Sequence, residues 1–150
     1  MKNRIALSLI LIIGCIGLGA CTAANADSGA RPDLSVQAGS ADFTSSTNNT
    51  VNKSVELTVG QKAVVSLWSN PTTGYSWSEQ AAIQNSTLVR QLDHKFVAPT
   101  DSKVVGAAGT EVWAFQAAAT GETTVTLQYG RPWSGGEKAA YTLVLIVSVR

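Results

Sequence analysis

Cysteine is scarce in this 150-residue chain and occurs only at Cys15 and Cys21. Residues 22–150 therefore cannot form a disulfide among themselves, and their fold has to be stabilised by a hydrophobic core. The same scarcity excludes a thiolate nucleophile and the sulfur-rich zinc sites from this part of the chain.

Histidine is almost absent as well, since His94 is the single one in the sequence. No pair of carboxylates has a spacing recognisable for acid–base catalysis. His94 follows Asp93 beside a predicted strand, a position more typical of a surface turn than of a catalytic dyad. We therefore expect a protein that is not an enzyme and that holds no cofactor and no metal ion.

An excess of charge is also missing, because 11 basic and 10 acidic side chains leave a net charge of +1. Without Lys2 and Arg4, which fall in a predicted targeting segment, nine basic side chains stand against ten acidic ones. This balance leaves no electrostatic footprint for nucleic acid, so we expect no nucleic-acid partner.

The apolar run near the N-terminus, Ile5–Ile13, is too short to span a membrane comfortably. Lys2 and Arg4 precede it, and small residues follow it from Gly14 to Ala20. Charged, apolar and small residues in this order are typical of a secretory signal. We predict a signal peptide at residues 1–20.

Two cleavage patterns follow the apolar run. Leu18-Gly19-Ala20-Cys21 resembles a bacterial lipobox, in which Cys21 becomes the lipid-modified first residue. Ala24-Asn25-Ala26 is a competing pattern that would release a soluble periplasmic or secreted protein. Because the lipobox lies closer to the apolar run, we favour an exported lipoprotein of the cell envelope, anchored to the membrane through a lipid on Cys21.

Residues 21–52 are rich in Ser, Thr and Asn and contain few large apolar residues. Such a segment buries too little apolar area to offset its ordering entropy, so we predict a flexible tether. Leu34, Val36 and Phe43 are isolated exceptions. The folded domain is predicted at residues 53–150.

From Val55 onward, apolar residues alternate with polar ones in short runs, which is typical of β-strands. The turn Gly60-Gln61 predicts a hairpin over residues 53–69, and the run 141–149 suits a central strand buried on both faces. Trp77 and Trp113 lie in alternating runs and are expected to pack in the core. Seven or eight such strands predict an all-β fold, an immunoglobulin-like β-sandwich without a disulfide.

Three polar segments between these strands have unusual compositions. The first loop, residues 70–75, reads Asn70-Pro71-Thr72-Thr73-Gly74-Tyr75 and combines several turn-forming residues, which predicts a rigid tip. The second loop, residues 106–109, reads Gly106-Ala107-Ala108-Gly109 and lets a backbone approach a partner closely. The third loop, residues 131–136, places Arg131-Pro132-Trp133 before Ser134-Gly135-Gly136, which indicates an exposed tryptophan. Arg131 is interpreted either as a solvated charge or as a brace for its loop.

Together and in this order, the three loops resemble those of the chagasin family of cysteine protease inhibitors. The Asn-Pro-Thr-Thr-Gly-aromatic and Arg-Pro-Trp motifs of that family are intact here. The second loop departs from the family pattern, because Ala108 stands where glycine is usual. An alanine there would be strained if the position required a positive φ.

The resemblance implies a reversible, competitive inhibitor of papain-like cysteine proteases. We expect the chain to be a monomer. Pro71, Thr72, Thr73 and Gly74 would then lie over the catalytic cysteine of the protease. The second loop would run beside the substrate-binding face and make backbone hydrogen bonds, and Trp133 would stack on the far side of the cleft.

An exposed Trp133 and Tyr75 on a β-sandwich are also compatible with a carbohydrate- or peptide-binding module of the cell envelope. The inhibitor hypothesis predicts that all three loops lie at one end of the sandwich. A sugar-binding module predicts a concave face or a row of aromatic residues along a sheet.

Overall fold

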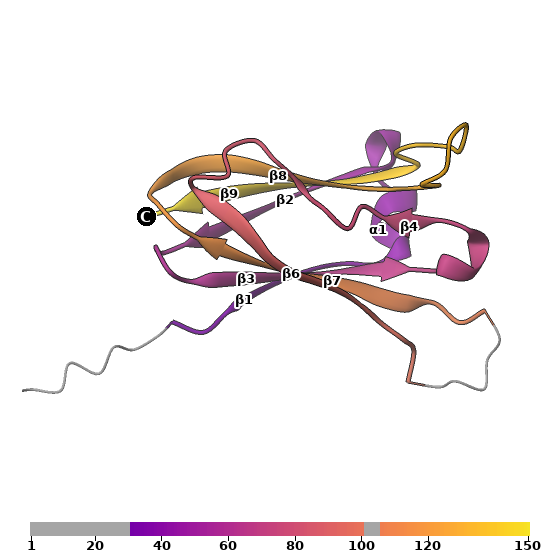
Figure 1. Ribbon diagram of the computed structural model, residues 1–150, viewed down its shortest axis with the longest axis horizontal. Helices are drawn as coiled ribbons and strands as arrows, with labels where there is room; N and C mark the ends of the chain where they lie inside the picture. Colours follow the sequence, from indigo (N-terminus) through magenta and orange to yellow (C-terminus); the bar gives the residue numbers. More distant parts are fainter. Residues whose placement is uncertain (1–30, 101–105) are drawn as a thin grey trace, which may run out of the picture.

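A computed structural model describes residues 31–100 and 106–150 of the chain. In these residues nine strands form two sheets that face each other (Figure 1). The predicted immunoglobulin-like β-sandwich is confirmed, with nine strands in place of seven or eight. The predicted signal peptide, Cys21 and the competing cleavage site lie outside the described residues.

The first sheet has the strand order β1-β3-β7-β6, which comprises β1 (Leu34–Ala38), β3 (Lys62–Ser69), β7 (Gly109–Ala117) and β6 (Val89–Val97). β1 runs parallel to β3, and the other neighbours are antiparallel. A bulge between Gln91 and Asp93 interrupts the register of β6 against β7.

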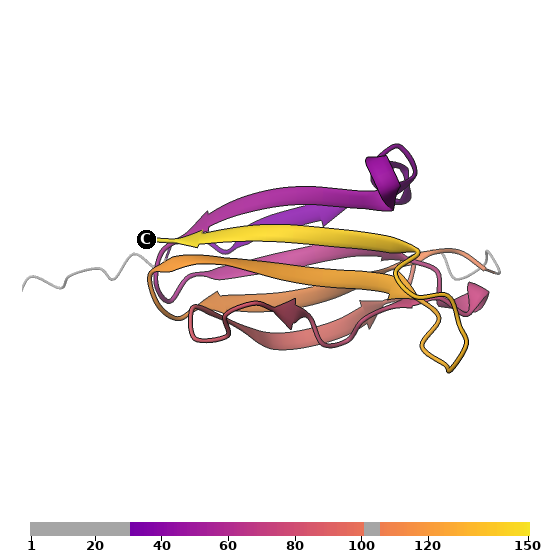
Figure 2. The same cartoon turned by 90° about the horizontal axis from the view of Figure 1, so that it is seen from above.

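The second sheet has the order β2-β9-β8-β4, with β2 (Thr50–Leu57), β9 (Tyr141–Val149), β8 (Gly121–Gly130) and the short β4 (Ser76–Trp77). The two-residue strand β5 (Ala82–Ile83) also pairs with β8. β2 runs parallel to β9, and Figure 2 shows β2, β9 and β8 lying side by side.

The core lies between the sheets and is built from alternate residues of the long strands. β7 shows the period most clearly, since Trp113, Phe115 and Ala117 are buried whereas Val112 and Ala114 are only half-buried. Trp77 and Trp113 are both buried, as the sequence predicts, and their rings meet edge to face at 6.4 Å. The apolar residues that alternate along the strands thus point to the same side of each sheet and form one core between the sheets.

The predicted hairpin at residues 53–69 is wrong, because β2 and β3 belong to different sheets. The turn between them passes from one sheet to the other and is closed by a hydrogen bond from Gln61 N to Thr58 O of 2.9 Å. Both strands bury their alternate residues in the same core, so their pattern alone cannot distinguish a hairpin from a crossing between sheets.

The predicted tether is wrong from Leu34 onward. β1 extends the first sheet by pairing Leu34–Ala38 with β3, and the one-turn helix α1 (Ser40–Thr44) buries Phe43 completely. A 3₁₀ turn, η1 (Thr47–Asn49), leads into β2. A few apolar residues therefore suffice to order this segment, because the rest of the fold supplies a strand edge and a core gap for them.

The run at residues 141–149 is central in its sheet, as predicted, but it is buried on one face only. Leu143, Leu145, Val147 and Val149 point into the core, whereas Ile146 is exposed. The expectation of burial on both faces is wrong because a sandwich of two layers leaves the outer face of each sheet in solvent. None of the helical segments in residues 31–100 and 106–150 is long and apolar enough to cross a membrane.

Candidate functional site

The first loop connects β3 to β4 and is a compact turn. Residues Pro71–Thr73 form the 3₁₀ turn η2, and Gly74 ends it in the left-handed conformation with φ 79°. Proline presets the φ value that begins such a turn, and glycine accepts the positive φ that ends it. The local sequence therefore determines the shape of this loop.

Asn70 organises the first loop through hydrogen bonds. Its side-chain Oδ1 accepts from Thr72 Oγ1 at 2.6 Å, and its carbonyl oxygen accepts from Thr73 Oγ1 at 2.6 Å. Its backbone N donates to the Tyr129 hydroxyl at 3.2 Å. Both threonine hydroxyls are thus used to hold the tip, which leaves a loop with little freedom to rearrange.

The second loop is joined to the first one, because Asn70 Nδ2 donates to the Gly106 carbonyl at 3.1 Å. Gly106 has φ 80°, a conformation that favours glycine. A Cβ on Gly109 would meet the Phe96 ring and lie 2.5 Å from the Val97 carbonyl. Gly109 therefore allows the close packing of β6 on β7.

Ala107 and Ala108 lie between these two glycines and are half-buried. Among the described residues other than glycine, only Asn48, Asn49 and Ala139 have positive φ values. Ala108 is accordingly free of the strain of a positive φ that is considered above. Its methyl group can affect only how closely a partner approaches this loop.

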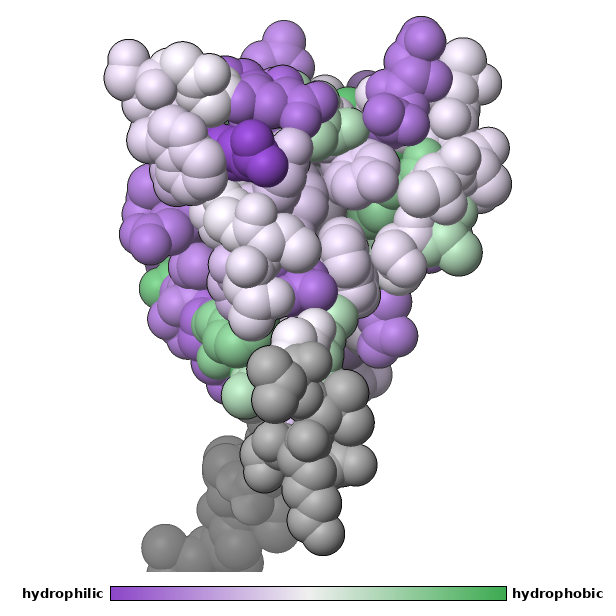
Figure 3. Space-filling model, turned by 90° about the vertical axis from the view of Figure 1, so that its right-hand side faces the viewer, coloured by the Kyte–Doolittle hydropathy of each residue, from purple (hydrophilic) through white to green (hydrophobic). Residues whose placement is uncertain are grey.

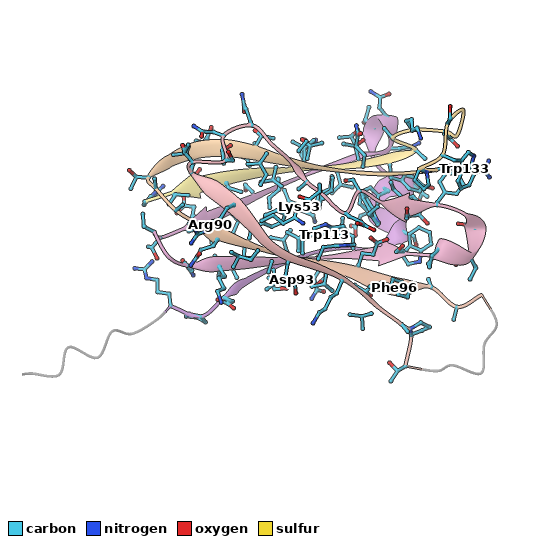
Figure 4. All side chains as sticks on the ribbon, viewed as in Figure 1. Lys53, Arg90, Asp93, Phe96, Trp113 and Trp133 are labelled. Carbon is cyan, nitrogen blue, oxygen red and sulfur yellow. The ribbon has the colours of Figure 1, made fainter. Side chains whose placement is uncertain are left out.

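The third loop follows β8 and carries Trp133 at its exposed end, with 50% of the residue accessible (Figure 4). Lys138 Nζ donates to two carbonyl oxygens of the loop, that of Arg131 at 2.6 Å and that of Trp133 at 2.8 Å. A Cβ on Gly74 would lie 2.9 Å from Cη2 of Trp133, so the indole packs directly on the first loop. The tryptophan is exposed but held in place.

The Arg131 guanidinium lies over two aromatic rings, with its Cζ 4.6 Å from the ring centre of Tyr75 and 5.6 Å from that of Trp133. Arg131 is therefore a brace between the first and third loops.

The Tyr75 hydroxyl donates to Oε2 of Glu137 at 2.5 Å and so adds a further link between these loops. This hydrogen bond, together with desolvation, raises the pKa of Tyr75 above its ordinary value of 10.0, and the nearby Arg131 charge opposes the rise.

The two ends of the first loop are held by one buried carboxylate, that of Glu111, which is 4% exposed. Its Oε1 accepts from Ser69 Oγ at 2.6 Å and from Trp77 N at 3.2 Å, on either side of the loop. Its Oε2 lies 2.9 Å from Nε2 of His94. The surface-turn interpretation of His94 is therefore wrong, because this residue lies within β6 and is partly buried against Glu111.

All three loops lie at one end of the sandwich, opposite the C-terminus (Figure 1). Figure 3 looks onto this end and shows mostly residues of intermediate hydropathy, without an extended hydrophobic patch. Within the described residues, no group of three or more His, Cys, Asp or Glu side chains could hold a metal ion. The described part of this end consists of turns, glycines and one exposed tryptophan, held together by the contacts above.

The structure brings the three loops that the sequence singled out to one end of the sandwich (Figure 1), and contacts join Asn70 to Gly106, Gly74 to Trp133 and Tyr75 to Arg131. Sequence reasoning missed the residues that hold the loops, which are Glu111, Tyr129, Glu137 and Lys138. These residues have no local pattern of their own. The only signal was the position of Glu137 and Lys138 directly after the third loop.

The chain is similar in sequence and in fold to known proteins. Residues 56–147 match the family described as Chagasin family peptidase inhibitor I42. Chagasin from Trypanosoma cruzi is 37% identical over 81 residues, which cover 53% of this chain and 73% of that protein.

Two solved structures share the fold at lower identity. The cysteine protease inhibitor EhICP2 from Entamoeba histolytica has a TM-score of 0.60 and 20% identity, and the match covers 80% of this chain and 100% of that one. Amebosin has a TM-score of 0.53 and 22% identity with the same coverage. At these identities the two structures support the fold alone.

Proposed function

The chain belongs to the chagasin family of cysteine protease inhibitors, and from this membership we propose that its three loops together block the active-site cleft of a papain-like protease. The observation that carries the proposal is the junction of the loops. Segments more than 30 residues apart in the sequence are joined at one end of the fold by the Asn70–Gly106 hydrogen bond and by the packing of Trp133 on Gly74.

In this proposal the first loop lies over the catalytic cysteine of the protease. Its backbone follows a tight 3₁₀ turn, whereas a cleavable substrate has to bind in an extended form. The second loop offers backbone groups beside the cleft, and Trp133 stacks on an apolar surface at its far side. The inhibitor is thereby bound as an obstacle and not as a substrate.

Tight binding by such a surface depends on loops that are ordered before the protease arrives. Each mobile side chain that an interface immobilises costs roughly 0.5–1.5 kcal/mol. Here Thr72, Thr73 and Arg131 are already engaged by neighbours within the inhibitor. The free protein has therefore lost most of this freedom on folding, and we expect reversible, competitive inhibition with slow dissociation.

The test is steady-state inhibition of papain by the purified chain from Thr22 to Arg150. A variant that combines Thr72→Ala, Thr73→Ala and Trp133→Ala serves as the control after circular dichroism has shown that it folds. We expect competitive inhibition at nanomolar to low micromolar concentration that the variant has lost. Absence of inhibition of papain and of a panel of cathepsins would contradict the proposal and favour a carbohydrate- or peptide-binding module.

For the location of the protein, we propose export followed by lipid anchoring at Cys21 in the cell envelope. The lipobox Leu18–Cys21 behind the apolar run supports this location. The intact mass of the protein purified from membranes tests it, because a diacylglyceryl group on Cys21 adds a defined mass. A soluble product that begins at Asp27 would contradict it. We also propose that the inhibitor acts as a monomer, which sedimentation of the lipid-free chain would test.

A further inference from the structure

A cavity of about 320 Å³ lies beside the first loop and has no role in the mechanism above. Its walls include Thr73 from that loop together with four aromatic side chains and one carboxylate, those of Trp68, Tyr75, Tyr129, Tyr141 and Glu137. Its volume is near the lower end of the range of about 300–1,000 Å³ that is usual for ligand pockets. Because Thr73 and Tyr75 of the first loop form part of the wall, the cavity borders the surface on which a protease would be seated in the proposed function.

The aromatic rings are arranged around Tyr129, which is buried. Its ring centre lies 5.6 Å from that of Trp68, 5.6 Å from that of Tyr75 and 5.9 Å from that of Tyr141. The other three rings are half-buried and so remain open to the cavity. Aromatic walls of this kind attract cations through the negative faces of their rings.

The charge of the residues that line the cavity also favours a cationic ligand. Glu137 carries the one carboxylate among the described residues that line the cavity, and these residues include no lysine or arginine. The Tyr75 hydroxyl engages Oε2 of Glu137, and no hydrogen bond among the described residues engages Oε1. Arg131 faces the Tyr75 ring but belongs to the lining of a separate cavity, with Pro132 and Lys138.

We propose that this cavity receives a lysine or arginine side chain from the rim of the bound protease. The alkyl stem of that side chain packs against the rings, and its charged head pairs with Glu137. This inference rests on the proposed function, because the protease supplies the side chain. It adds to the three loops a fourth contact, which selects proteases with a basic residue beside the cleft.

The first test uses the free chain from Thr22 to Arg150 and small probes in place of a protease. N-acetyl-lysine methylamide is titrated while the indole N–H resonance of Trp68 is followed by NMR, and the neutral N-acetyl-norleucine methylamide is the matched probe. We expect a saturable shift with the lysine probe alone. Glu137→Gln should weaken this binding about tenfold, whereas Tyr75→Phe, which keeps the carboxylate, should retain it.

Equal responses to the two probes would overturn the proposal, as would unchanged binding in Glu137→Gln. Because no protease is present, this titration succeeds or fails independently of the proposed function.

The second test uses a papain-like protease that carries a lysine or arginine beside its active-site cleft, and it measures inhibition of this protease by Glu137→Gln and by the matched variant Glu122→Gln. Glu122 is an exposed carboxylate at the start of β8, at the opposite end of the sandwich from the loops. We expect a rise of about tenfold in the inhibition constant for Glu137→Gln and none for Glu122→Gln. Equal constants for the two variants would overturn the proposal. If the unmodified chain inhibits neither papain nor the panel of cathepsins, the proposed function fails, and the protease as the source of the side chain fails with it.

Discussion

The side chain of Trp133 is exposed to solvent, and contacts within the protein fix its position. It packs on Gly74, it lies under the Arg131 guanidinium, and Lys138 holds its carbonyl oxygen. A large aromatic ring that is ordered before binding loses little entropy when a partner covers it. Trp133 is therefore the residue of this surface from which we expect the largest single contribution to affinity.

Replacement of Trp133 by alanine should weaken inhibition of papain at least about thirtyfold, because truncation of a buried interface tryptophan costs about 2 kcal/mol or more. The inhibition constant of the purified variant measures this loss. Val59→Ala is a suitable control, since Val59 is also a large apolar residue and is 52% exposed but lies in the turn between β2 and β3. An unchanged constant for folded Trp133→Ala would remove Trp133 from the interface.

Comparison of Gly74→Ala with Gly60→Ala separates the effect of backbone strain from the effect of contact with Trp133. Gly74 and Gly60 both have positive φ values, 79° and 87°, so alanine should cost about 1–2 kcal/mol of stability at either position. Only at Gly74 does a new Cβ meet the indole of Trp133, and at Gly60 nothing lies within 4 Å of it. We expect urea unfolding to show a similar loss of free energy of unfolding for both variants, and papain inhibition to be weaker for Gly74→Ala alone. Equal inhibition by both variants would show that the position of Trp133 is unimportant.

The pKa of Tyr75 is raised chiefly by its hydrogen bond to the Glu137 carboxylate. Since the folded pKa lies above the unfolded one, the link stabilises the fold fully at pH values below about 10 and is lost as the pH rises through the folded pKa. The phenolate absorbance should therefore contain a component that ionises late, and Tyr75→Phe should remove the contribution of Tyr75 to it. Glu137→Gln should shift its midpoint downward. A midpoint that stays unchanged would contradict this assignment.

At the scale of the elements, β7 controls the first loop through Glu111. The carboxylate joins the end of β3 to the start of β4 and contacts His94 on β6, so four strands meet at one buried group. Its hydrogen bonds fix the distance between the two ends of the loop. The first loop is thereby positioned by the buried Glu111 carboxylate as well as by its own turn residues.

Glu111→Ala should lower the free energy of unfolding by about 3 kcal/mol, because it removes one member of a buried polar network. It should also weaken inhibition, since Ser69 and Trp77 N lose their common acceptor. Leu145→Ala, in the core of β9, should cost about 2–5 kcal/mol of stability without a change in the inhibition constant of the folded protein. If Glu111→Ala inhibits as well as Leu145→Ala does, the carboxylate has no positioning role.

The strands and loops were predictable from the sequence where a local pattern determines them. Alternation identified β2, β3, β7 and β8, and the turn residues identified the first loop, because both depend on neighbours in the chain. The sheet to which each strand belongs was not predictable, and the false hairpin at β2 and β3 shows why: inward-facing alternation is the same in either sheet. The link between Tyr75 and Glu137 was equally hidden, since these residues are 62 positions apart.

At the scale of the whole molecule, the segment before β2 is part of the fold. Its polar composition predicted a tether, since composition averages over the three apolar residues that matter. Phe43 fills a gap between the sheets, with its ring centre 5.2 Å from that of Trp77 and 5.5 Å from that of Tyr141. Trp77 belongs to β4, which begins directly after the first loop, and Tyr141 lines the cavity beside that loop. The N-terminal segment therefore supports the same end of the sandwich that carries the loops.

Removal of the Phe43 ring should destabilise the fold strongly. Phe43→Ala should lower the free energy of unfolding by about 3–5 kcal/mol, because it leaves a cavity among packed aromatic rings. Phe96→Ala, at a ring that is 44% exposed on the outer side of β6, should cost much less (Figure 4).

A chain that begins at Val51 lacks both β1 and α1. It exposes Trp77 and Tyr141 and leaves the edge of β3 unpaired, so it should unfold at a lower urea concentration than the chain from Thr22. Because the loss falls at the end that carries the loops, the shortened chain should also inhibit papain more weakly. Equal unfolding midpoints for the two chains would show that residues 22–50 are a tether after all.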